Sequence, residues 1–213
     1  MKLGIYGAGG FGREVAETAV DQNIWEEIVF IDDFNNSDYL DGLKRVSFKE
    51  FCSKYHPDDT RIVCAVGDPK HKKELYERVL NAHYGLANVI HDKSVLSKRA
   101  SIGNGVILRA GVVVSIDAVI GDNVAIMENS YIGHGCRIDD NSQVSSNVSI
   151  GGNVTVGKES FIGAGVCIKE KVNIGDNSII GMGAVVINDI SSCTTYYNSL
   201  EKKTKKNNFE DIF

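Results

Sequence analysis

One of the five histidines in this sequence, His134, lies inside a regular repeat rather than in an irregular segment. Histidine changes charge near neutral pH, so an outward-facing histidine can act as a general base that accepts a proton from a reacting group. His134 stands two positions after Ile132, which the repeat places inward, and we therefore expect it to face outward. An ordinary exposed histidine is the alternative. We expect the remaining histidines to be surface or packing residues: His56, His71, His83 and His91.

A glycine-rich turn near the amino terminus carries a second chemical signal. Gly7, Gly9 and Gly12 follow a short apolar segment in the pattern GxGxxG, and Asp32 comes 20 residues after Gly12. Backbone N–H groups at a helix N-terminus can hold a diphosphate, and a carboxylate after the next strand can accept hydrogen bonds from a sugar or a base. The turn could bind NAD, be purely structural, or bind a nucleotide-linked sugar. We favour the sugar, because roughly 90 residues are too few for both halves of an NAD site.

The element that positions His134 is set by a six-residue period. From Leu96 to Val186 every sixth residue is aliphatic, which gives 16 successive positions without an exception. The residue four positions after each of them is small or β-branched. Glycine often follows the aliphatic residue, and we expect it to adopt corner conformations that are closed to other residues.

A period of six fits neither an α-helix nor an alternating strand, but it predicts a parallel β-helix in which each hexad forms one short strand and one corner. Three hexads would make one triangular coil. Residues 18 apart should then stack about 4.8 Å apart along the axis, with the aliphatic side chains filling a narrow prism. The period covers about residues 91–190.

The first 90 residues have a different pattern and predict a small α/β domain. Short apolar segments predict the strands of a parallel, Rossmann-like sheet at 2–6, 28–31 and 61–66. Helical spacing occurs at 13–20 and 70–81. We therefore divide the chain into an α/β domain, a β-helix domain and a carboxy-terminal tail, at 1–90, 91–190 and 191–213.

Composition excludes several other classes of protein. The net charge of −5 argues against nucleic-acid binding, which needs a concentrated basic surface. No apolar run reaches the roughly 18 residues that a membrane span needs, so we expect a soluble cytoplasmic protein without membrane contact. The cysteines show no CxxC or CxH spacing and predict neither a zinc site nor a disulfide framework. We expect buried, reduced thiols at Cys52, Cys64, Cys136, Cys167 and Cys193.

The order of these parts resembles one branch of the hexapeptide-repeat acyltransferases, whose coils form a left-handed β-helix. This branch contains sugar acetyltransferases such as the bacillosamine-pathway and perosamine N-acetyltransferases, with the sialic acid O-acetyltransferases as relatives. The matching stretches are IYGAGGFG at 5–12, FIDDF at 30–34, AVGD at 65–68, KKELY at 72–76 and SYIGHGC at 130–136. Together they span nearly the whole chain to about residue 190.

The resemblance implies a role for particular residues. His134 would be the catalytic base, and the main-chain N–H of Gly152, one coil later, would hold the acetyl carbonyl of acetyl-CoA; a plain corner glycine is the alternative. Ala164 and Met182 would line the pantetheine path. The nucleotide-sugar pocket would be lined by Gly9, Gly10, Asp32, Asp33 and Gly67. The resemblance also implies a homotrimer with acetyl-CoA in the groove between neighbouring prisms, and no metal.

The sequence departs from the family pattern at three places. The family often has an acid directly after the catalytic histidine, where this chain has Gly135, so the group that would orient the imidazole is missing locally. Gln143 stands where a second histidine is common near the thioester. The tail lacks the Asn-Pro-Ala-Lys segment of the family. Its lysines could meet the phosphates of CoA, but we favour a solvated tail: Lys202, Lys203, Lys205 and Lys206.

These features predict an acetyl-CoA-dependent N-acetyltransferase that acts on the 4-amino group of a nucleotide-linked amino-deoxy sugar, for surface glycan biosynthesis. O-acetylation of a sugar or of sialic acid is an alternative, but a hydroxyl needs stronger base assistance, which the glycine after His134 puts in doubt. A catalytically inactive β-helix that serves as a binding module is the other alternative.

Overall fold

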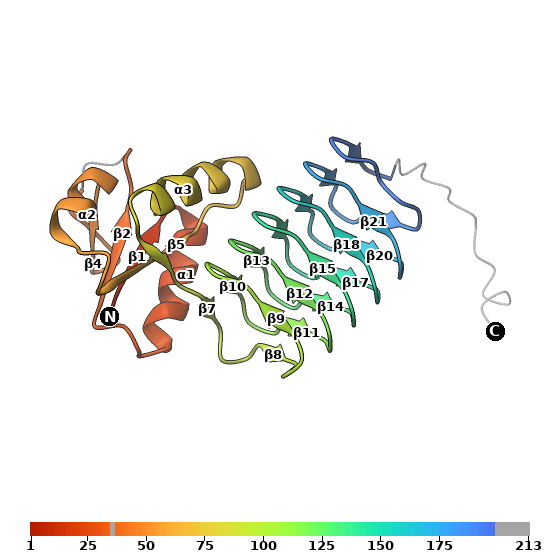
Figure 1. Ribbon diagram of the computed structural model, residues 1–213, viewed down its shortest axis with the longest axis horizontal. Helices are drawn as coiled ribbons and strands as arrows, with labels where there is room; N and C mark the ends of the chain where they lie inside the picture. The colour runs from red at the N-terminus through yellow and green to blue at the C-terminus, as the bar shows by residue number, and fades with distance from the viewer. Residues whose placement is uncertain (35–36, 199–213) are drawn as a thin grey trace, which may run out of the picture.

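The computed structural model describes residues 1–34 and 37–198, and it contains two stacked parts (Figure 1). The amino-terminal part holds a six-stranded sheet in the order β3-β4-β2-β1-β5-β6. Its strands are β1 Lys2–Tyr6, β2 Glu27–Ile31, β3 Tyr39–Leu40, β4 Leu43–Val46, β5 Thr60–Cys64 and β6 Gly85–Leu86. The helices are α1 Gly10–Asp21, α2 Phe48–Lys54 and α3 Pro69–Asn81.

The two faces of this sheet are covered by different helices. Val15 and Ala19 of α1 pack with Leu3 and Ile5 on one face, and this cluster continues onto the β-helix through Ile107. On the other face, α2 and α3 contribute Phe48, Phe51, Leu75 and Val79 to a second cluster. The parallel strands β1, β2 and β5 confirm the βαβ prediction. The short strand β3 pairs antiparallel with β4, so the sheet is mixed rather than purely parallel as expected.

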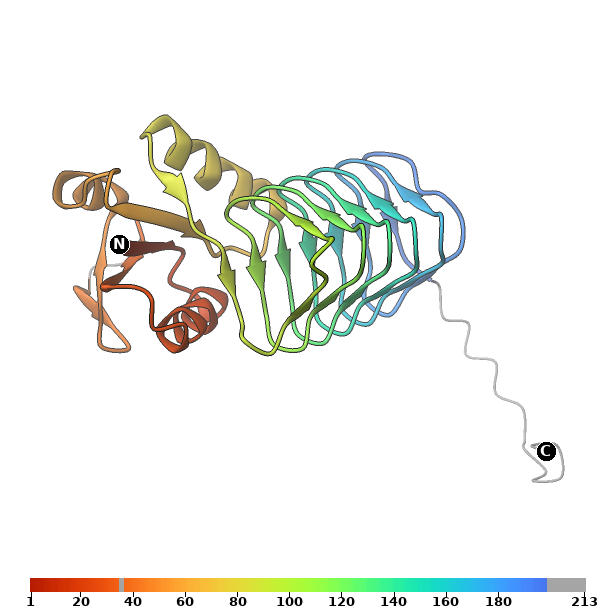
Figure 2. The ribbon, with the colours of Figure 1, turned by 60° about the horizontal axis from the view of Figure 1, so that its bottom comes forward.

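The carboxy-terminal part is a parallel β-helix of two-residue strands arranged in three sheets (Figure 2). Sheet B contains β7 Val89–Ile90, β10 Ile107–Leu108, β13 Ala125–Ile126, β16 Gln143–Val144, β19 Phe161–Ile162, β22 Ile179–Ile180 and β24 Thr195–Tyr196. Sheet C contains β8 Val95–Leu96, β11 Val113–Val114, β14 Tyr131–Ile132, β17 Ser149–Ile150, β20 Cys167–Ile168 and β23 Val185–Val186. Sheet D contains β9 Ser101–Ile102, β12 Val119–Ile120, β15 Arg137–Ile138, β18 Thr155–Val156 and β21 Asn173–Ile174.

The register of these strands follows the sequence period. Ile132 pairs with Ile150, and Ile150 pairs with Ile168, so residues 18 apart stack as predicted. The inward aliphatic residues form one continuous buried core. The coils begin with β7, two residues before position 91, and continue past position 190 to β24. The coiled part therefore extends beyond both ends of the range in which the six-residue period was identified. The lysines of the tail, at 202–206, lie outside the described residues.

The glycines at the corners are required for a different reason from the one expected. The glycine after each inward aliphatic residue does not adopt a positive φ; the left-handed corner positions lie two residues further on and often hold asparagine, such as Asn147 and Asn153. A Cβ on Gly133 would lie 2.7 Å from the carbonyl carbon of Gly151 in the next coil. These glycines are therefore required by the close approach of neighbouring coils, not by unusual backbone angles.

The cysteines are all free, and two of them, Cys64 and Cys136, are buried as expected. The prediction is wrong for Cys52, Cys167 and Cys193, which are exposed. Cys167 occupies the outward position of its strand, and Cys193 lies in a left-handed corner with φ 57°. In the described ranges, none of the helices has the length and hydropathy required to cross a membrane.

Candidate active site

A first cavity of about 340 Å³ lies at the carboxyl ends of the parallel strands. It is lined by the glycine turn and by the residues that follow β2: Tyr6, Gly7, Ala8, Gly9, Ile31, Asp32, Asp33, Phe34, Val66, His71, Leu75 and Arg78. We call it the strand-end cavity. Parallel α/β sheets bind ligands at this edge, because the loops and helix N-termini that follow the strands converge there.

Two glycines of the turn, Gly7 and Gly12, are required for steric reasons. Gly7 has φ 116°, a conformation that favours glycine, and a Cβ on Gly12 would collide with the carbonyl of Gly7. Cβ atoms on Gly9 or Gly10 would meet no protein atom within 4 Å. Gly9 is the N-cap of α1 and no side chain caps this helix, so its first N–H groups remain available for an anion. Gly10 itself is not among the residues that line the cavity.

The two acids after β2 have different surroundings. Asp33 is tied by three hydrogen bonds, from Phe48 N–H (2.8 Å), the Tyr6 hydroxyl (2.7 Å) and Arg78 Nη1 (2.8 Å). Partial burial raises the pKa of Asp33, but these hydrogen bonds more than compensate, so the pKa is lowered overall. Asp32 accepts one hydrogen bond, from Phe34 N–H (3.0 Å). Its other oxygen lies 3.7 Å from the buried Arg45 guanidinium, outside hydrogen-bond distance, and is therefore the freer acceptor.

The strand-end cavity is also lined by His71, which was expected to be a surface or packing residue, and by Arg78, which the sequence analysis did not name. Both lie on α3, seven residues apart with Leu75 between them, so the helical period places them on one face. The Arg78 guanidinium carbon lies 4.9 Å from the ring centre of Phe48. The seven-residue separation of His71 and Arg78 was the signal that the sequence offered. It does not predict that α3 packs beside the glycine turn.

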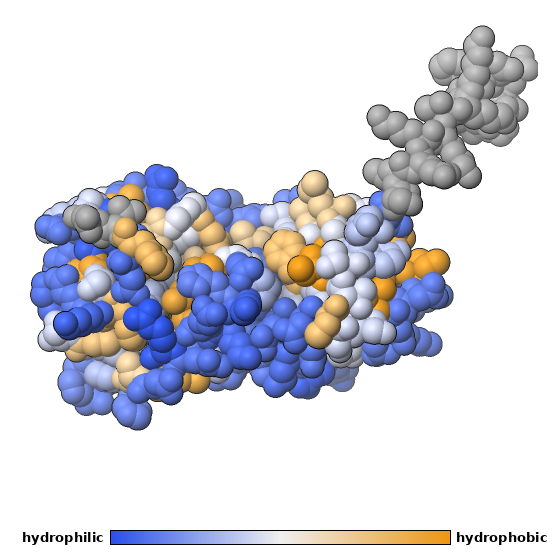
Figure 3. All heavy atoms as spheres, turned by 90° about the horizontal axis from the view of Figure 1, so that it is seen from above, coloured by the Kyte–Doolittle hydropathy of each residue, from blue (hydrophilic) through white to orange (hydrophobic). Residues whose placement is uncertain are grey.

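Gly67 lines a second cavity rather than the first. This interdomain cavity has a volume of about 580 Å³ and lies between the start of α3 and sheet B, lined by Gly67, Asp68, Pro69, Lys70, Glu159, Phe161, Asn177 and Ile179. The segment Val66–Gly67 has one residue in each cavity, so the two spaces lie on either side of it. In the view from above, apolar residues gather over the later coils of the β-helix (Figure 3).

His134 is exposed at the corner between sheets C and D, which confirms its predicted outward direction. Its imidazole lies directly over Gly152: a Cβ built there would be 2.6 Å from Nε2 and 2.8 Å from Nδ1. Within the described residues, no hydrogen bond uses the Gly152 N–H, and no acid lies within 4 Å of the imidazole nitrogens. The corner therefore combines a solvent-accessible base with an open N–H donor.

Ala164 and Met182 do not share the corner of His134. They lie at the corner between sheets B and C, where Ala164 is partly buried and Met182 is 82% exposed. Sheet C separates the two corners, so one chain does not bring the predicted acetyl-CoA residues together. No group of three or more metal-ligating side chains occurs in the part of the chain that the structure describes.

Gln143 is buried against the amino-terminal domain. Lys72 of α3 is fully buried, and its amine donates to the Ser142 carbonyl (3.0 Å) and to Gln143 Oε1 (3.3 Å). Burial lowers the pKa of Lys72 to about 7, because an apolar setting disfavours the charged ammonium. Sequence analysis did not identify this lysine, since nothing in its local pattern shows that a coil would cover it.

Comparison with known proteins agrees with this architecture. The sequence matches the families described as the PglD N-terminal domain over residues 2–79, the bacterial transferase hexapeptide (six repeats) over 117–152 and the hexapeptide repeat of succinyl-transferase over 153–187. Fold and site thus define a hexapeptide-repeat acetyltransferase with an α/β amino-terminal domain. The chain belongs to the PglD-type family of these enzymes, as the next comparisons show.

Solved structures of three relatives cover almost the whole chain. The acetyltransferase domain of PglB from Neisseria gonorrhoeae, also solved in complex with acetyl coenzyme A, is 30% identical, with a TM-score of 0.88 over 92% of this chain and 96% of that one. PerB from Caulobacter crescentus, solved with CoA and GDP-perosamine, is 26% identical, with a TM-score of 0.84 over 93% and 94%. WeeI from Acinetobacter baumannii is 25% identical, with a TM-score of 0.74 over 93% and 97%.

Proposed function

We propose that this protein transfers the acetyl group of acetyl-CoA to the 4-amino group of a nucleotide-linked amino-deoxy sugar. The observation that carries the proposal is the pairing of an open helix N-terminus and an Asp32 oxygen that accepts no hydrogen bond from the described residues, in one domain, with an exposed His134 over Gly152 in the other. Relatives of similar sequence were solved with acetyl coenzyme A and with CoA plus GDP-perosamine. This arrangement supports two ligands that enter from different domains.

The nucleotide would occupy the strand-end cavity. Its diphosphate would lie against the first N–H groups of α1 beside Gly9 and Gly10, where both the helix dipole and the open donors favour negative charge. Asp32 would accept hydrogen bonds from the base or ribose, while Asp33 would shape the floor through its three fixed partners. The sugar would pass Gly67 toward the interdomain cavity.

His134 would act as the general base. The free amine attacks the thioester carbonyl and forms the C–N bond, and the carbonyl oxygen becomes an oxyanion that the Gly152 N–H stabilises. As the tetrahedral intermediate collapses, the C–S bond breaks and CoA leaves as a thiolate. The proton lost by the amine passes to His134 and then to the thiolate. A free amine is a good nucleophile once deprotonated, which favours N-acetylation over O-acetylation at this corner.

We propose a homotrimer as the active assembly. Sheet C exposes Val95, Tyr131 and Val185 on its outer side, and such apolar faces indicate an interaction surface. His134 and Gly152 lie along one edge of this face, and Ala164 and Met182 along the other. Three copies arranged around one axis with this face inward would bring unlike edges together and complete the acetyl-CoA groove.

A thiol-release assay tests the proposal. Wild-type protein would be incubated with acetyl-CoA and a panel of UDP-, dTDP- and GDP-linked 4-amino sugars, with matched 4-hydroxy sugars and sialic acid as comparators. We expect acceptor-dependent CoA release with an amino sugar and much slower release with every hydroxyl acceptor. Release only with a hydroxyl acceptor would establish O-acetylation, and no release with any acceptor would indicate a binding module.

A further inference from the structure

The three faces of the β-helix differ in what covers them. The amino-terminal domain packs on the first coils of sheet B, where Ile107 and Ala125 are buried. The outer side of sheet D is polar in its later strands, with Arg137, Thr155 and Asn173. Sheet C presents an apolar outer side along most of its length that no described part of the chain covers, whereas sheet B exposes apolar residues only in its later strands, such as Ile179.

The edges of sheet C carry complementary groups at the same level. Glu128 lies at the corner between sheets B and C, and His134 at the corner between sheets C and D, six residues later in the same coil. A coil of 18 residues rises about 4.8 Å, so these two residues differ in height by only about a third of that rise. An acid and a base thus face away from opposite edges of one apolar face.

Packing of the sheet C faces of three copies around a threefold axis would bring these two edges together. When three copies turn the same face toward a parallel axis, the B–C corner of each copy meets the C–D corner of its neighbour, and the rotation leaves the small difference in height between the two residues unchanged. His134 then faces Glu128 of the partner subunit. The apolar face and the acid–base match across its edges favour a second copy of this chain as the occupant over an unrelated partner.

The surroundings of Glu128 leave its carboxylate able to form such a contact. Its Oε1 accepts a hydrogen bond from Arg109 Nε (2.8 Å) and its Oε2 from the Ser146 hydroxyl (3.1 Å). With the bond from its own backbone N–H, three of about four acceptor positions of the carboxylate are used and one remains open, and the side chain is 30% exposed. Partial burial raises the pKa of Glu128, but hydrogen bonds from its own backbone N–H and from Arg109 outweigh it, so the pKa is lowered and the group stays ionised.

Within its own described chain, His134 lacks such a partner. Gly135 follows it at a left-handed corner position with φ 64°, and no described acid lies within 4 Å of the ring. Asp117, one coil earlier at the same corner, is paired with Arg99 at 2.8 Å, as Glu128 is with Arg109, and it lies outside ion-pair distance of His134. The imidazole packs on Gly152 and has no side-chain hydrogen bond or ion pair within the described residues.

We infer that Glu128 of the partner subunit is the positioning residue that orients His134 and stabilises its cationic form. The contact would replace, across a subunit boundary, the acid that this chain lacks after its histidine. The inference rests on the proposed function and on the trimer described there. It makes each active site dependent on two copies of the chain.

Mixed trimers test the inference directly. Glu128→Gln, which keeps the shape and removes the charge, should lower kcat by about 10- to 100-fold, a part of what general-base catalysis contributes. Glu128→Asp should recover part of this loss. Co-expression of Glu128→Gln with His134→Ala should restore about a quarter of wild-type activity, because random assembly pairs an intact histidine with an intact glutamate at about one site in four.

A matched control combines two variants whose substituted residues lie at the same edge of sheet C. Co-expression of His134→Ala with Gly152→Val should restore nothing, because both residues reach the site from one copy. The Glu128→Gln trimer should also move the acidic limb of the pH–rate profile to lower pH by about one unit, a shift that a purely structural role would not produce.

The outcomes separate the inference from the proposed function. Inactive wild-type protein would reject the function itself. Active wild type with no gain in the Glu128→Gln and His134→Ala mixture would reject the inference, as would an unshifted pH profile in a Glu128→Gln trimer that keeps the wild-type melting temperature. If Glu128→Gln fails to assemble, Glu128→Asp is co-expressed with His134→Ala instead. An activity of this mixture that equals the average of the two separate proteins would also reject the inference.

Discussion

The two parts of this molecule build their sites in opposite ways. In the amino-terminal domain, loops after the strands converge, and Asp33 is held by Tyr6, Arg78 and the backbone of Phe48 within one chain. In the β-helix, identical corners repeat along an axis, and His134 stands on Gly152 with no polar partner in the described chain. A converging fold brings its polar groups together within one chain, whereas a repeating fold spreads them along the edges of its sheets.

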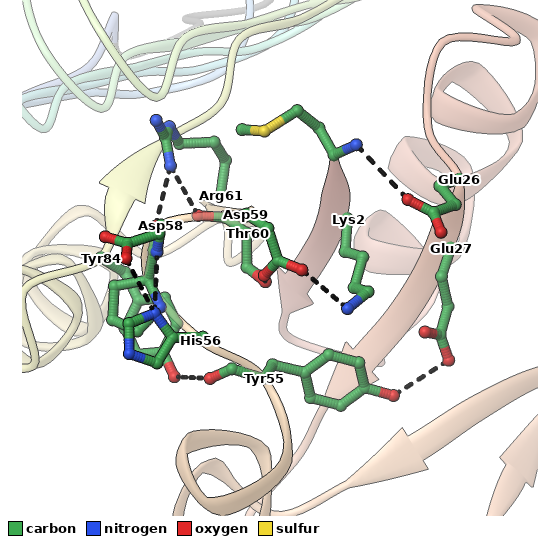
Figure 4. Close-up of polar contacts among 12 residues, drawn as sticks. Lys2, Glu26, Glu27, Tyr55, His56, Asp58, Asp59, Thr60, Arg61 and Tyr84 are labelled. Carbon is green, nitrogen blue, oxygen red and sulfur yellow. Dashed lines mark hydrogen bonds and ion pairs between the residues drawn. The ribbon is translucent and has the colours of Figure 1, made fainter.

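The opposite end of the sheet shows that charge density alone does not make a site. At the amino ends of the strands, Lys2 pairs with Asp59 (2.8 Å), and the Tyr55 hydroxyl donates to Glu27 (3.0 Å) (Figure 4). The Arg61 side chain donates to the carbonyl of Thr60 at 2.9 Å. These groups satisfy one another, while the strand-end cavity keeps uncapped N–H donors of α1 and an Asp32 oxygen that accepts no hydrogen bond from the described residues.

The sharpest test of the contrast is the loss of His134. His134→Ala should lower kcat by about 100-fold, the lower end of general-base assistance, and change both Michaelis constants far less. The proton moves only as the amine attacks, so the effect belongs to the transition state. Steady-state kinetics measure both parameters, and the acidic limb of the pH–rate profile should vanish. His56→Ala, an exposed control, should leave all three unchanged; a loss under about threefold in His134→Ala would make this residue a surface histidine.

Gly152→Ala probes the corner without removing the base. The new Cβ would lie 2.6 Å from the present position of Nε2, so the imidazole must move. We expect kcat to fall by about 10- to 50-fold while the melting temperature changes little, since misplaced catalytic groups lose rate rather than stability. In a His134→Ala background the same change should cost much less. Equal losses in both backgrounds would show that Gly152 acts independently of the histidine ring.

The two neighbouring acids should separate ligand binding from folding. Asp32→Asn should weaken nucleotide-sugar binding by about 5- to 30-fold and leave acetyl-CoA affinity intact, because the ligands contact different domains. Calorimetric titrations with each ligand measure this. Asp33→Asn should lower the free energy of unfolding by about 1–2 kcal/mol, since it weakens several charge-assisted hydrogen bonds. If Asp32→Asn reduces both affinities together, the division of labour between the domains is wrong.

Lys72 tests the contact between the two parts through pH. Its pKa is lowered to about 7 by burial, whereas an unfolded lysine titrates near 10.5. Between these values the unfolded state binds more protons, so this residue makes stability rise with pH, by up to about 1.4 kcal/mol per pH unit. Below pH 7 both states are protonated and this contribution to the slope disappears.

Urea unfolding of Lys72→Met at pH 6.5, 7.5 and 8.5 checks this expectation, because the variant should lose that slope. Lys73→Met is the matched control: its amine is more exposed and pairs with Glu159 at 2.8 Å. The control should keep the wild-type slope. A slope that is the same in wild type and Lys72→Met would show that the lysine is not held in a dry contact.

Some parts of the site were predictable because they repeat or lie close in sequence. The six-residue period gave the coils, their 18-residue register and the stacking of Gly152 under His134. The GxGxxG turn and the acid after β2 lie within one βαβ unit, so local pattern was sufficient for their common cavity. The β3–β4 hairpin was missed, since Tyr39–Leu40 is too short to show a period. Helix α2 was also missed.

Sequence by itself determined the backbone path of most of this protein, because a hexad pattern and a βαβ pattern each fix local geometry through the burial of apolar side chains. Tertiary structure decided which polar groups became satisfied. It buried Lys72 beneath a coil 70 residues away, tied Asp33 by three hydrogen bonds but left one oxygen of Asp32 with only a longer ion pair to Arg45, and placed Gly67 in a second cavity. Hydrogen bonds and desolvation depend on distances between segments remote in sequence, which no local period encodes.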